Sequence, residues 1–204
     1  MSDSKQSVYR FLNYINILER LNHQGIMVVS SQNLAGLCDL TASQLRKDLM
    51  KFPSIGRQKV GYQVSELLEM LKKEIKRDNF VDIIIIGVGN FGTALIKYQS
   101  FEKYGIRIVA GFDVDMSARK DVNVPIFHID KASDYIKANN IELAILAVPE
   151  KEAQSEAINI VKAGIRKILN LTPAILFLDE QVRVNNVNLA YELEYLLIKK
   201  GAKE

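Results

Sequence analysis

The sequence predicts an α/β protein in which an N-terminal winged helix-turn-helix is followed by a Rossmann-type domain with a parallel sheet and by a C-terminal helix. Two observations carry this prediction. An apolar strand runs directly into a glycine-rich GxGxxG loop over residues 81–92, which is how a dinucleotide-binding βαβ unit begins. About 80 residues precede the loop and about 110 follow it, so a separate domain fits in front of one nucleotide-binding domain.

Composition excludes several other classes of protein. Hydrophobic residues make up 48% of the chain and charged residues 25%, the usual range for globular proteins. The single cysteine, Cys38, excludes an internal disulfide, and its apolar neighbours predict a buried side chain rather than a redox thiol. The N-terminus lacks a secretory apolar region, no apolar run is long enough to span a membrane, and two histidines with one cysteine cannot make a His/Cys-rich metal site. We therefore expect a cytoplasmic protein with no membrane segment and no metal.

Positive charge is concentrated in one stretch. The chain has a net charge of +3, and residues 40–62 alone carry a net +4. The basic residues of this stretch are Arg46, Lys47, Lys51, Arg57 and Lys59, against the single acid Asp48. A local basic cluster in an otherwise nearly neutral chain favours a face that binds a polyanion. The alternative is an ordinary solvated helix surface.

The first 50 residues predict three helices. Apolar residues recur at steps of three and four from Val8 to Leu21, which indicates an amphipathic helix of about 18 residues that ends at Gly25. Ser30 or Ser31 can cap a short second helix. A third helix is expected to begin after Thr41, which stands three residues before Gln44 in a capping-box arrangement.

This third helix is the expected recognition helix of a helix-turn-helix. Leu45 and Leu49 form its apolar side. Glutamine and arginine can contact base edges in a major groove, and lysine usually contacts phosphate. Residues 54–61 hold two glycines around basic residues, which predicts a hairpin wing, and Ser65 is expected to cap a further helix over residues 66–77. The expected DNA contacts are Ser43, Gln44, Arg46, Lys47, Lys51, Arg57, Lys59 and Tyr62. Helix-turn-helix shapes also occur in proteins that bind only protein, so that alternative stays open.

The glycine-rich loop follows a buried-type strand at residues 83–86. Gly87 permits the tight turn, Gly89 lets a pyrophosphate approach the backbone, and Gly92 permits close packing of the helix whose N-terminus holds the phosphates. Asp113 ends the next strand 21 residues after Gly92, where an acid accepts hydrogen bonds from the adenosine ribose hydroxyls. Because an acid repels a 2′-phosphate, NAD(H) is favoured over NADP(H), although the nearby bases of residues 119–120 could serve a phosphate.

Further strands and helices alternate to the end of the chain. Strands are expected at residues 124–127, 141–148, 167–171 and 182–184, and helices at residues 153–163 and 189–199. Ligands in this architecture bind beyond the carboxyl ends of the strands, which nominates Val148, Pro149, Asn170, Leu171 and Pro173 as pocket lining. The two prolines could equally only end their strands. The terminal helix has an apolar side that needs either its own domain or a partner subunit.

Short motifs in a fixed order then resemble a known family. They are Tyr14, Ser30-Ser31, residues 44–49 (QLRKDL), Gly61-Tyr62, residues 87–95 with Tyr98 and Phe101, residues 111–115 (GFDVD), Val148-Pro149, residues 168–170 and Asn186-Val187. Together they resemble the Rex redox-sensing transcriptional repressors over nearly the full length of the chain. The expected cofactor-binding residues are Gly87, Gly89, Asn90, Phe91, Gly92, Tyr98, Asp113, Val148, Pro149, Asn170 and Pro173.

The resemblance implies a homodimer. Its winged-helix domains (residues 1–78) would bind a pseudo-palindromic double-stranded DNA operator, and its Rossmann domains (79–181) would bind NADH or NAD⁺. The C-terminal strand and helix (182–204) would be swapped into the partner and reach its nicotinamide pocket. NADH would release the DNA, and NAD⁺ would compete and permit binding.

The chain departs from the family at several positions. Residues 50–53 read MKFP where the family usually has serine-tyrosine-phenylalanine-glycine, and Gln58-Lys59 replaces arginine-glycine in the wing. Many members carry a basic residue at the position of Asn16 and an aspartate at Asn188, a pair that could form a salt bridge in one dimer state only. Two asparagines cannot form it, so a weaker or differently tuned response to NADH is expected. The expected dimer and switch residues are Asn16, Asn188 and Leu189.

Two other functions share features with this sequence. An NAD-dependent oxidoreductase needs a substrate domain, for which the residues after the loop leave no room. His128 is expected to be a surface or packing histidine rather than a general acid. A CoA-binding module shares the glycine-rich βαβ start, but Asp113 favours a ribose diol. We therefore expect no catalytic residue.

Overall fold

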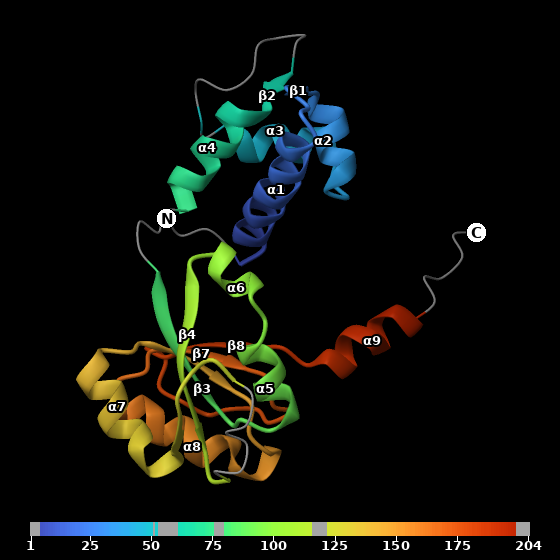
Figure 1. Cartoon of the computed structure of the whole chain (residues 1–204). Helices are drawn as coiled ribbons and strands as arrows, with labels where there is room; N and C mark the ends of the chain where they lie inside the picture. Colours follow the sequence, from blue (N-terminus) through green and yellow to red (C-terminus); the bar gives the residue numbers. More distant parts are fainter. Residues whose placement is uncertain (1–4, 51, 53–60, 76–79, 116–121, 199–204) are drawn as a thin grey trace. The chain divides into compact units, whose positions relative to one another are not determined.

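Figure 1 shows the computed structural model of the chain, which describes residues 5–50, 52, 61–75, 80–115 and 122–198. The chain divides into two compact units, Met1–Asp78 and Asn79–Glu204. None of the helices within the described ranges is long and apolar enough to cross a membrane.

The first unit has the element order of a winged helix-turn-helix. Its elements are α1 (Lys5–His23), β1 (Val28–Val29), α2 (Ser31–Leu37), α3 (Ala42–Leu49), β2 (Tyr62–Gln63) and α4 (Val64–Ile75). Strands β1 and β2 pair antiparallel, with Val29 opposite Tyr62, and so form the base of the expected wing. Residues 54–60 of that wing lie outside the described residues.

Side-chain caps fix the start of the two central helices. Ser30, one of the two serines considered, caps α2 by accepting a hydrogen bond from the Asn33 N–H at 3.0 Å. Thr41 caps α3 by accepting from the Gln44 N–H at 3.1 Å. These caps satisfy N–H groups that have no partner inside the helix. The capping box is only half formed, because the Gln44 side chain bonds to Asp48 instead of returning to Thr41.

The expected cap of α4 is wrong. The helix begins at Val64, so Ser65 lies in its first turn and does not precede it. Val64 is fully buried and its N–H donates to the Met27 carbonyl. The helix starts two residues before the predicted residue 66. The predicted end of this helix, residue 77, lies outside the described residues.

One apolar cluster holds the first unit together. Apolar residues of α1, α2, α3 and α4 meet in it, and its fully buried members include Tyr14, Leu18, Leu34, Leu45, Leu67 and Leu71. Cys38 is buried at the C-terminal end of α2, as predicted, and burial raises the pKa of its thiol to about 11. The apolar sides of the helices thus face inward and leave the polar side of α3 outside.

The second unit is built on a parallel sheet. Within the described residues, six strands follow the order β5-β4-β3-β6-β7-β8, and every neighbouring pair is parallel. The strands are β3 (Val81–Ile86), β4 (Ile106–Asp113), β5 (Ile126–His128), β6 (Leu143–Leu146), β7 (Lys167–Asn170) and β8 (Arg183–Asn186). The chain runs outward from β3 in one direction through β4 and β5, and in the other through β6, β7 and β8. The order therefore reverses between β3 and β6, the switch point at which such sheets bind ligands.

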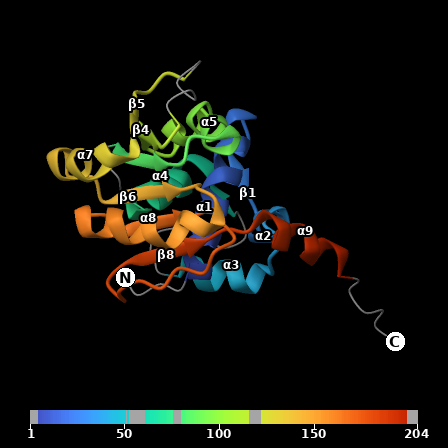
Figure 2. The same cartoon turned by 90° about the horizontal axis from the view of Figure 1, so that it is seen from below.

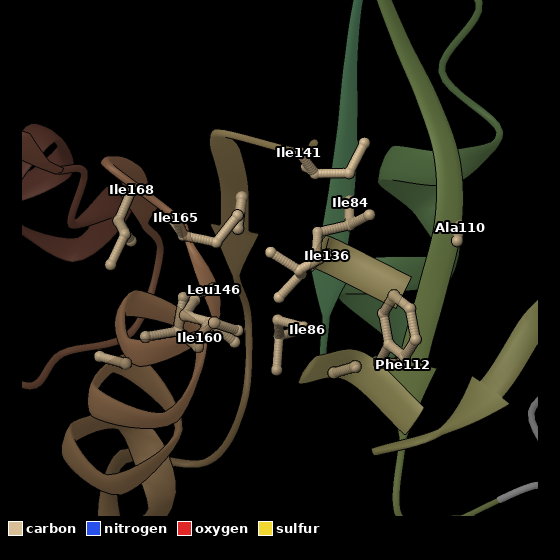
Figure 3. Close-up of a cluster of buried hydrophobic side chains, with 14 of the residues drawn as sticks. Ile84, Ile86, Ala110, Phe112, Ile136, Ile141, Leu146, Ile160, Ile165 and Ile168 are labelled. Carbon is tan, nitrogen blue, oxygen red and sulfur yellow. The ribbon is translucent and has the colours of Figure 1, made fainter. Parts of the chain in front are cut away.

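Helices cover both faces of this sheet (Figures 1 and 2). The helical segments are α5 (Asn90–Ile96), α6 (Ser100–Lys103), the 3-10 turn η2 (Ile129–Lys131), α7 (Ala132–Asn139), α8 (Glu150–Ala163) and α9 (Leu189–Leu197). Ile84 and Ile86 face α7 and α8, and Figure 3 shows them beside Ile136 and Phe112. The alternate residues Ile83 and Ile85 face the α5–α6 side. This alternation is the period of two expected of a strand buried on both faces.

Several boundaries differ from the predicted ones. The strand expected over residues 141–148 is β6, Leu143–Leu146, because residues 147–149 form the turn beyond the sheet. Pro149 occupies the N-cap position of α8, which begins at Glu150 and not at residue 153. The predicted strand at residues 182–184 is β8 and belongs to the sheet. Helices α6 and α7 were not predicted.

Candidate functional site

The glycines of the loop between β3 and α5 are needed for different reasons. Gly87 has a φ of +94°, and a Cβ there would lie 2.5 Å from the Ala147 carbonyl oxygen. A Cβ on Gly92 would collide with the Gly87 carbonyl oxygen. A Cβ on Gly89 would meet no protein atom within 4 Å. The fold therefore requires Gly87 and Gly92, whereas the space beside Gly89 is open to a ligand.

Asp113 stands at the end of β4, next to this loop. Its carboxylate accepts hydrogen bonds from the backbone N–H of Val88, inside the loop, and from that of Asp115 at 2.8 Å. These bonds orient the acid over the first turn of the loop. A carboxylate has about four acceptor positions. The two N–H groups use two of them, so acceptor positions remain for the two hydroxyls of a ribose. Residues 119 and 120, the nearby bases, lie outside the described residues.

The end of β6 meets the same loop. A Cβ added at Gly87 would lie 2.8 Å from the Val148 backbone nitrogen. The half-buried Val148 is therefore a direct neighbour of the turn. Pro149 is exposed and begins α8. The structure thus brings together Gly87, Gly89, Asp113, Val148 and Pro149 at the switch point of the sheet.

Asn170, at the end of β7, is buried and fully bonded. Its Nδ2 donates to the Ala174 carbonyl at 2.9 Å and to Asn186 Oδ1 at 2.8 Å. Its Oδ1 accepts from the N–H and the hydroxyl of Thr172. The side chain therefore holds the loop that carries the exposed Pro173. Direct contact of Asn170 with a cofactor stays a prediction.

Three further expected cofactor residues lie on or just beyond α5. Asn90 and Phe91 occupy its first turn and are exposed. Tyr98 follows the opposite end of the helix, is 55% exposed, and packs edge-to-face against Phe101 with ring centroids 5.1 Å apart. Tyr98 is therefore not part of the glycine loop itself.

The polar side of α3 carries the described part of the expected DNA surface. Ser43, Arg46 and Lys47 are exposed, and Arg46 donates to the Ser31 hydroxyl at 3.1 Å. Tyr62 is only 8% exposed and lies in the apolar cluster of the first unit, so it offers little surface to DNA. Gln44 is half-buried on the same helix. Three further expected contacts, Lys51, Arg57 and Lys59, lie outside the described residues.

Beneath this surface lies a polar network that the sequence interpretation missed. The Asp48 carboxylate accepts from Arg10 Nε at 2.6 Å and Nη2 at 2.9 Å, from the Tyr14 hydroxyl at 2.8 Å and from Gln44 Nε2 at 2.8 Å. Burial alone would raise the pKa of Asp48, but the hydrogen bonds from Arg10, Tyr14 and Gln44 outweigh it and hold that pKa below its usual value. Burial, together with the bond to Asp48, raises the pKa of Tyr14. The sequence signal that could have indicated this network is Asp48 itself, a single acid in a basic helix, one turn after Gln44.

The three expected dimer and switch residues lie on different elements. Asn16 is exposed on α1. Asn188 caps α9 by accepting from the Ala190 N–H at 3.0 Å. Leu189 is 57% exposed, and α9 has no buried residue at all. An apolar helix with no buried residue among the described ones is the feature expected of a surface that another chain covers.

No group of three or more His, Cys, Asp or Glu side chains that could hold a metal ion occurs among the described residues. His128 ends β5 and pairs with Asp130 at 3.0 Å, with its side chain 41% exposed. This half-buried position agrees with the expectation of a surface or packing histidine.

Comparison with known proteins identifies the family. A Rex redox-sensing transcriptional repressor of Carboxydothermus hydrogenoformans is 38% identical over 192 residues, which cover 93% of this chain and 92% of that protein. The chain belongs to the Rex family of redox-sensing transcriptional repressors. A Rex repressor of Desulforamulus reducens is 34% identical over 97% of the chain and 95% of its own length. The resemblance seen in the sequence is thus confirmed.

Solved structures of a Rex-family repressor share the fold of this chain's two units. One, in complex with NAD⁺ and operator DNA, is 34% identical, with a TM-score of 0.88 over 97% of this chain and 92% of that one. Another, in complex with NADH, is 33% identical, with a TM-score of 0.86 over 97% and 93%. Residues 4–49 also match the family "Putative DNA-binding protein N-terminus" and residues 78–174 the family "CoA binding domain". The predicted fold class is confirmed for both units of this Rex-family chain.

Proposed function

We propose that this Rex-family chain is a homodimeric cytoplasmic regulator that binds operator DNA, senses the NADH/NAD⁺ ratio and releases the DNA when NADH binds. The observation that carries the proposal is the shared fold with a Rex repressor in complex with both NAD⁺ and operator DNA, at a TM-score of 0.88. Residues 1–78 would bind the DNA, residues 79–181 the dinucleotide, and residues 182–204 the partner subunit.

The geometry of the glycine loop supports NAD(H) as the ligand. The space beside Gly89 admits a pyrophosphate close to the backbone, and the oriented carboxylate of Asp113 suits a ribose diol. Such an acid disfavours the 2′-phosphate of NADP(H). With Val148 and Pro149 beside the turn, the adjacent end of β6 would line the same pocket.

The first unit supports DNA as the partner. Helix α3 follows the short turn after α2 and presents Ser43, Arg46 and Lys47 to solvent. Residues of these types contact base edges and phosphates when a recognition helix enters the major groove. Two copies of this unit in a dimer would match a pseudo-palindromic operator.

Helix α9 supports the dimer. Its large apolar residues Leu193, Leu196 and Leu197 are 64%, 75% and 80% exposed. A swap of this helix into the partner would cover them and place Leu189 and Asn188 near the partner's dinucleotide site. NADH could then act as a switch, provided that it binds the DNA-released arrangement more tightly than the DNA-bound one, because equal affinity would shift nothing.

A titration of operator binding across NADH:NAD⁺ ratios tests the proposal directly. We expect release as the NADH fraction rises, with no consumption of NADH, because the chain is proposed as a regulator and not as an enzyme. Arg46→Ala and Lys47→Ala should weaken operator binding and leave NADH binding intact. Loss of NADH binding in these variants would contradict the division of labour between the two units.

A CoA-binding function is the second candidate, because residues 78–174 match the CoA-binding family model. The adenosine ribose of CoA carries a 3′-phosphate, which the carboxylate of Asp113 would repel. Competition for bound NADH, followed by its fluorescence, separates the two ligands. Displacement by CoA at concentrations similar to those of NAD⁺ would favour the CoA function.

A further inference from the structure

The Asp48 carboxylate on α3 has its acceptor positions in use. Arg10 supplies two donors from α1, Tyr14 supplies one, and Gln44 supplies the fourth from the preceding turn of α3. An ionised carboxylate offers about four such positions. Asp48 is only 8% exposed and Tyr14 is fully buried. The carboxylate is therefore fixed in place from the core side of the helix.

This fixed carboxylate selects one orientation of the Gln44 amide. A carboxylate can only accept hydrogen bonds, so Nε2 must face it, as it does at 2.8 Å, and Oε1 must turn away. The amide that remains available to a ligand consists of one acceptor, Oε1, and one N–H of Nε2. Gln44 is half-buried on the face of α3 that also carries the exposed Ser43 and Lys47.

One acceptor beside one donor matches adenine and not guanine. In the major groove, adenine presents the N6 amino donor next to the N7 acceptor, whereas guanine presents two acceptors, O6 and N7. The oriented Gln44 amide can pair with both atoms of adenine. Against guanine, Oε1 would face O6 and repel it, and the single free N–H could serve only one of the two acceptors.

We infer that Asp48, anchored by Arg10 and Tyr14, is a positioning residue that sets the Gln44 amide to select adenine over guanine at one base pair of each operator half-site. The inference rests on the proposed function, in which α3 enters the major groove. Asp48 does not touch DNA and acts only through Gln44. Specificity at this base pair thus originates partly from α1, which supplies both anchors.

Selection of binding sites from a random duplex DNA library by the full-length protein provides the test. The enriched duplex and its single-base variants are then titrated by fluorescence anisotropy. Adenine at one position should bind roughly ten- to a hundredfold more tightly than guanine. Gln44→Ala should abolish the preference at that position only, because the three donors from Arg10 and Tyr14 still hold Asp48.

Asp48→Asn should relax the preference at the same position, because an asparagine amide can donate as well as accept and leaves the Gln44 amide free to turn. Leu67→Ala is the matched control, since it weakens the core of the same unit without touching the network and should keep the preference. Should Asp48→Asn not fold, Arg10→Lys removes the two-point anchor and should relax the preference partly.

The outcomes separate this inference from the proposed function. If no sequence is enriched, the proposed DNA-binding function is wrong, and the inference falls with it. If a sequence is enriched but Gln44→Ala keeps the wild-type base profile, only the inference is overturned. A uniform loss of affinity in Asp48→Asn, equal to that in Leu67→Ala and without change at any single position, overturns it too.

Discussion

At the scale of single residues, the hydrogen bonds from Arg10, Tyr14 and Gln44 make the buried charge of Asp48 stabilising. Its four hydrogen bonds hold its pKa below the usual value despite burial. We expect Asp48→Asn to lower the free energy of unfolding by about 3 kcal/mol at neutral pH, because Arg10 and Tyr14 lose their charged partner. The sign of the pH dependence follows from the lowered pKa. The stabilisation is complete above the unfolded-state pKa of about 3.9 and is lost as the pH falls through the lower folded-state pKa.

Denaturant unfolding at a series of pH values measures both effects. Glu19→Gln is the matched control in the same unit, since Glu19 pairs with Lys72 at 2.6 Å but is 37% exposed. Such an exposed pair contributes at most about 1 kcal/mol. Equal losses of stability in the two variants would mean that the Asp48 network is not a significant part of the fold.

We expect substitutions of Gly87 and Gly89 to affect different properties, the first stability and the second NADH binding. Gly87→Ala should lower the free energy of unfolding by about 2 kcal/mol or more, because the new Cβ meets backbone and the positive φ disfavours a side chain. Gly89→Ala should leave thermal stability nearly unchanged, since its Cβ meets nothing in the protein, and weaken NADH binding roughly tenfold or more. Thermal melts and NADH fluorescence measure the two effects. Full NADH affinity in Gly89→Ala would contradict the proposed pyrophosphate position.

At the scale of elements, the sequence predicted segments with strong local signals and missed those without them. The β3–glycine loop–α5 unit and the capped α2 and α3 follow from adjacent residues, so each was found. Helix α7 was missed because its eight residues bury only Ala132 and Ile136, too short a pattern to show a helical period. The Asp48 network was missed because it joins residues of α1 and α3 that are 34 and 38 positions apart. Asn170 was nominated as pocket lining, but its partners Thr172, Ala174 and Asn186 could not be read from spacing.

Helix α9 carries the element-scale prediction. Its leucines gain stability only if another chain covers them, at about 1.5–3 kcal/mol for each buried leucine. Leu193→Glu combined with Leu196→Glu should therefore weaken the dimer by at least about 3 kcal/mol and yield monomers in light scattering. Far-UV circular dichroism should stay nearly unchanged, because both side chains are exposed in the single chain. Glu192→Gln on the same helix should leave the dimer intact, and a dimer that survives the double change would rule out α9 as the contact.

At the scale of the whole molecule, a dinucleotide can control DNA only if the proposed dimer has two arrangements that NADH distinguishes. The coupling free energy between two ligand sites is typically about 1–3 kcal/mol. One interaction that is present in only one of the two arrangements can therefore supply much of this coupling free energy. The resemblance to the Rex family implies a basic residue and an aspartate at the positions where this chain has Asn16 and Asn188. We propose that the missing pair weakens the NADH response of this member.

Restoring the pair tests this proposal. Asn16→Arg suits an exposed position on α1, and Asn188→Asp keeps a carboxylate oxygen in the place that caps the Ala190 N–H of α9. If the pair stabilises the DNA-released arrangement, the double variant should release operator DNA at about fivefold less NADH than the wild type. Each single variant should differ little, because the interaction exists only when both partners are present. Operator titrations with NADH at fixed NAD⁺ measure the shift. Release of the wild type by low micromolar NADH in a large excess of NAD⁺, or equal shifts in the single and double variants, would show that the asparagines do not limit the response.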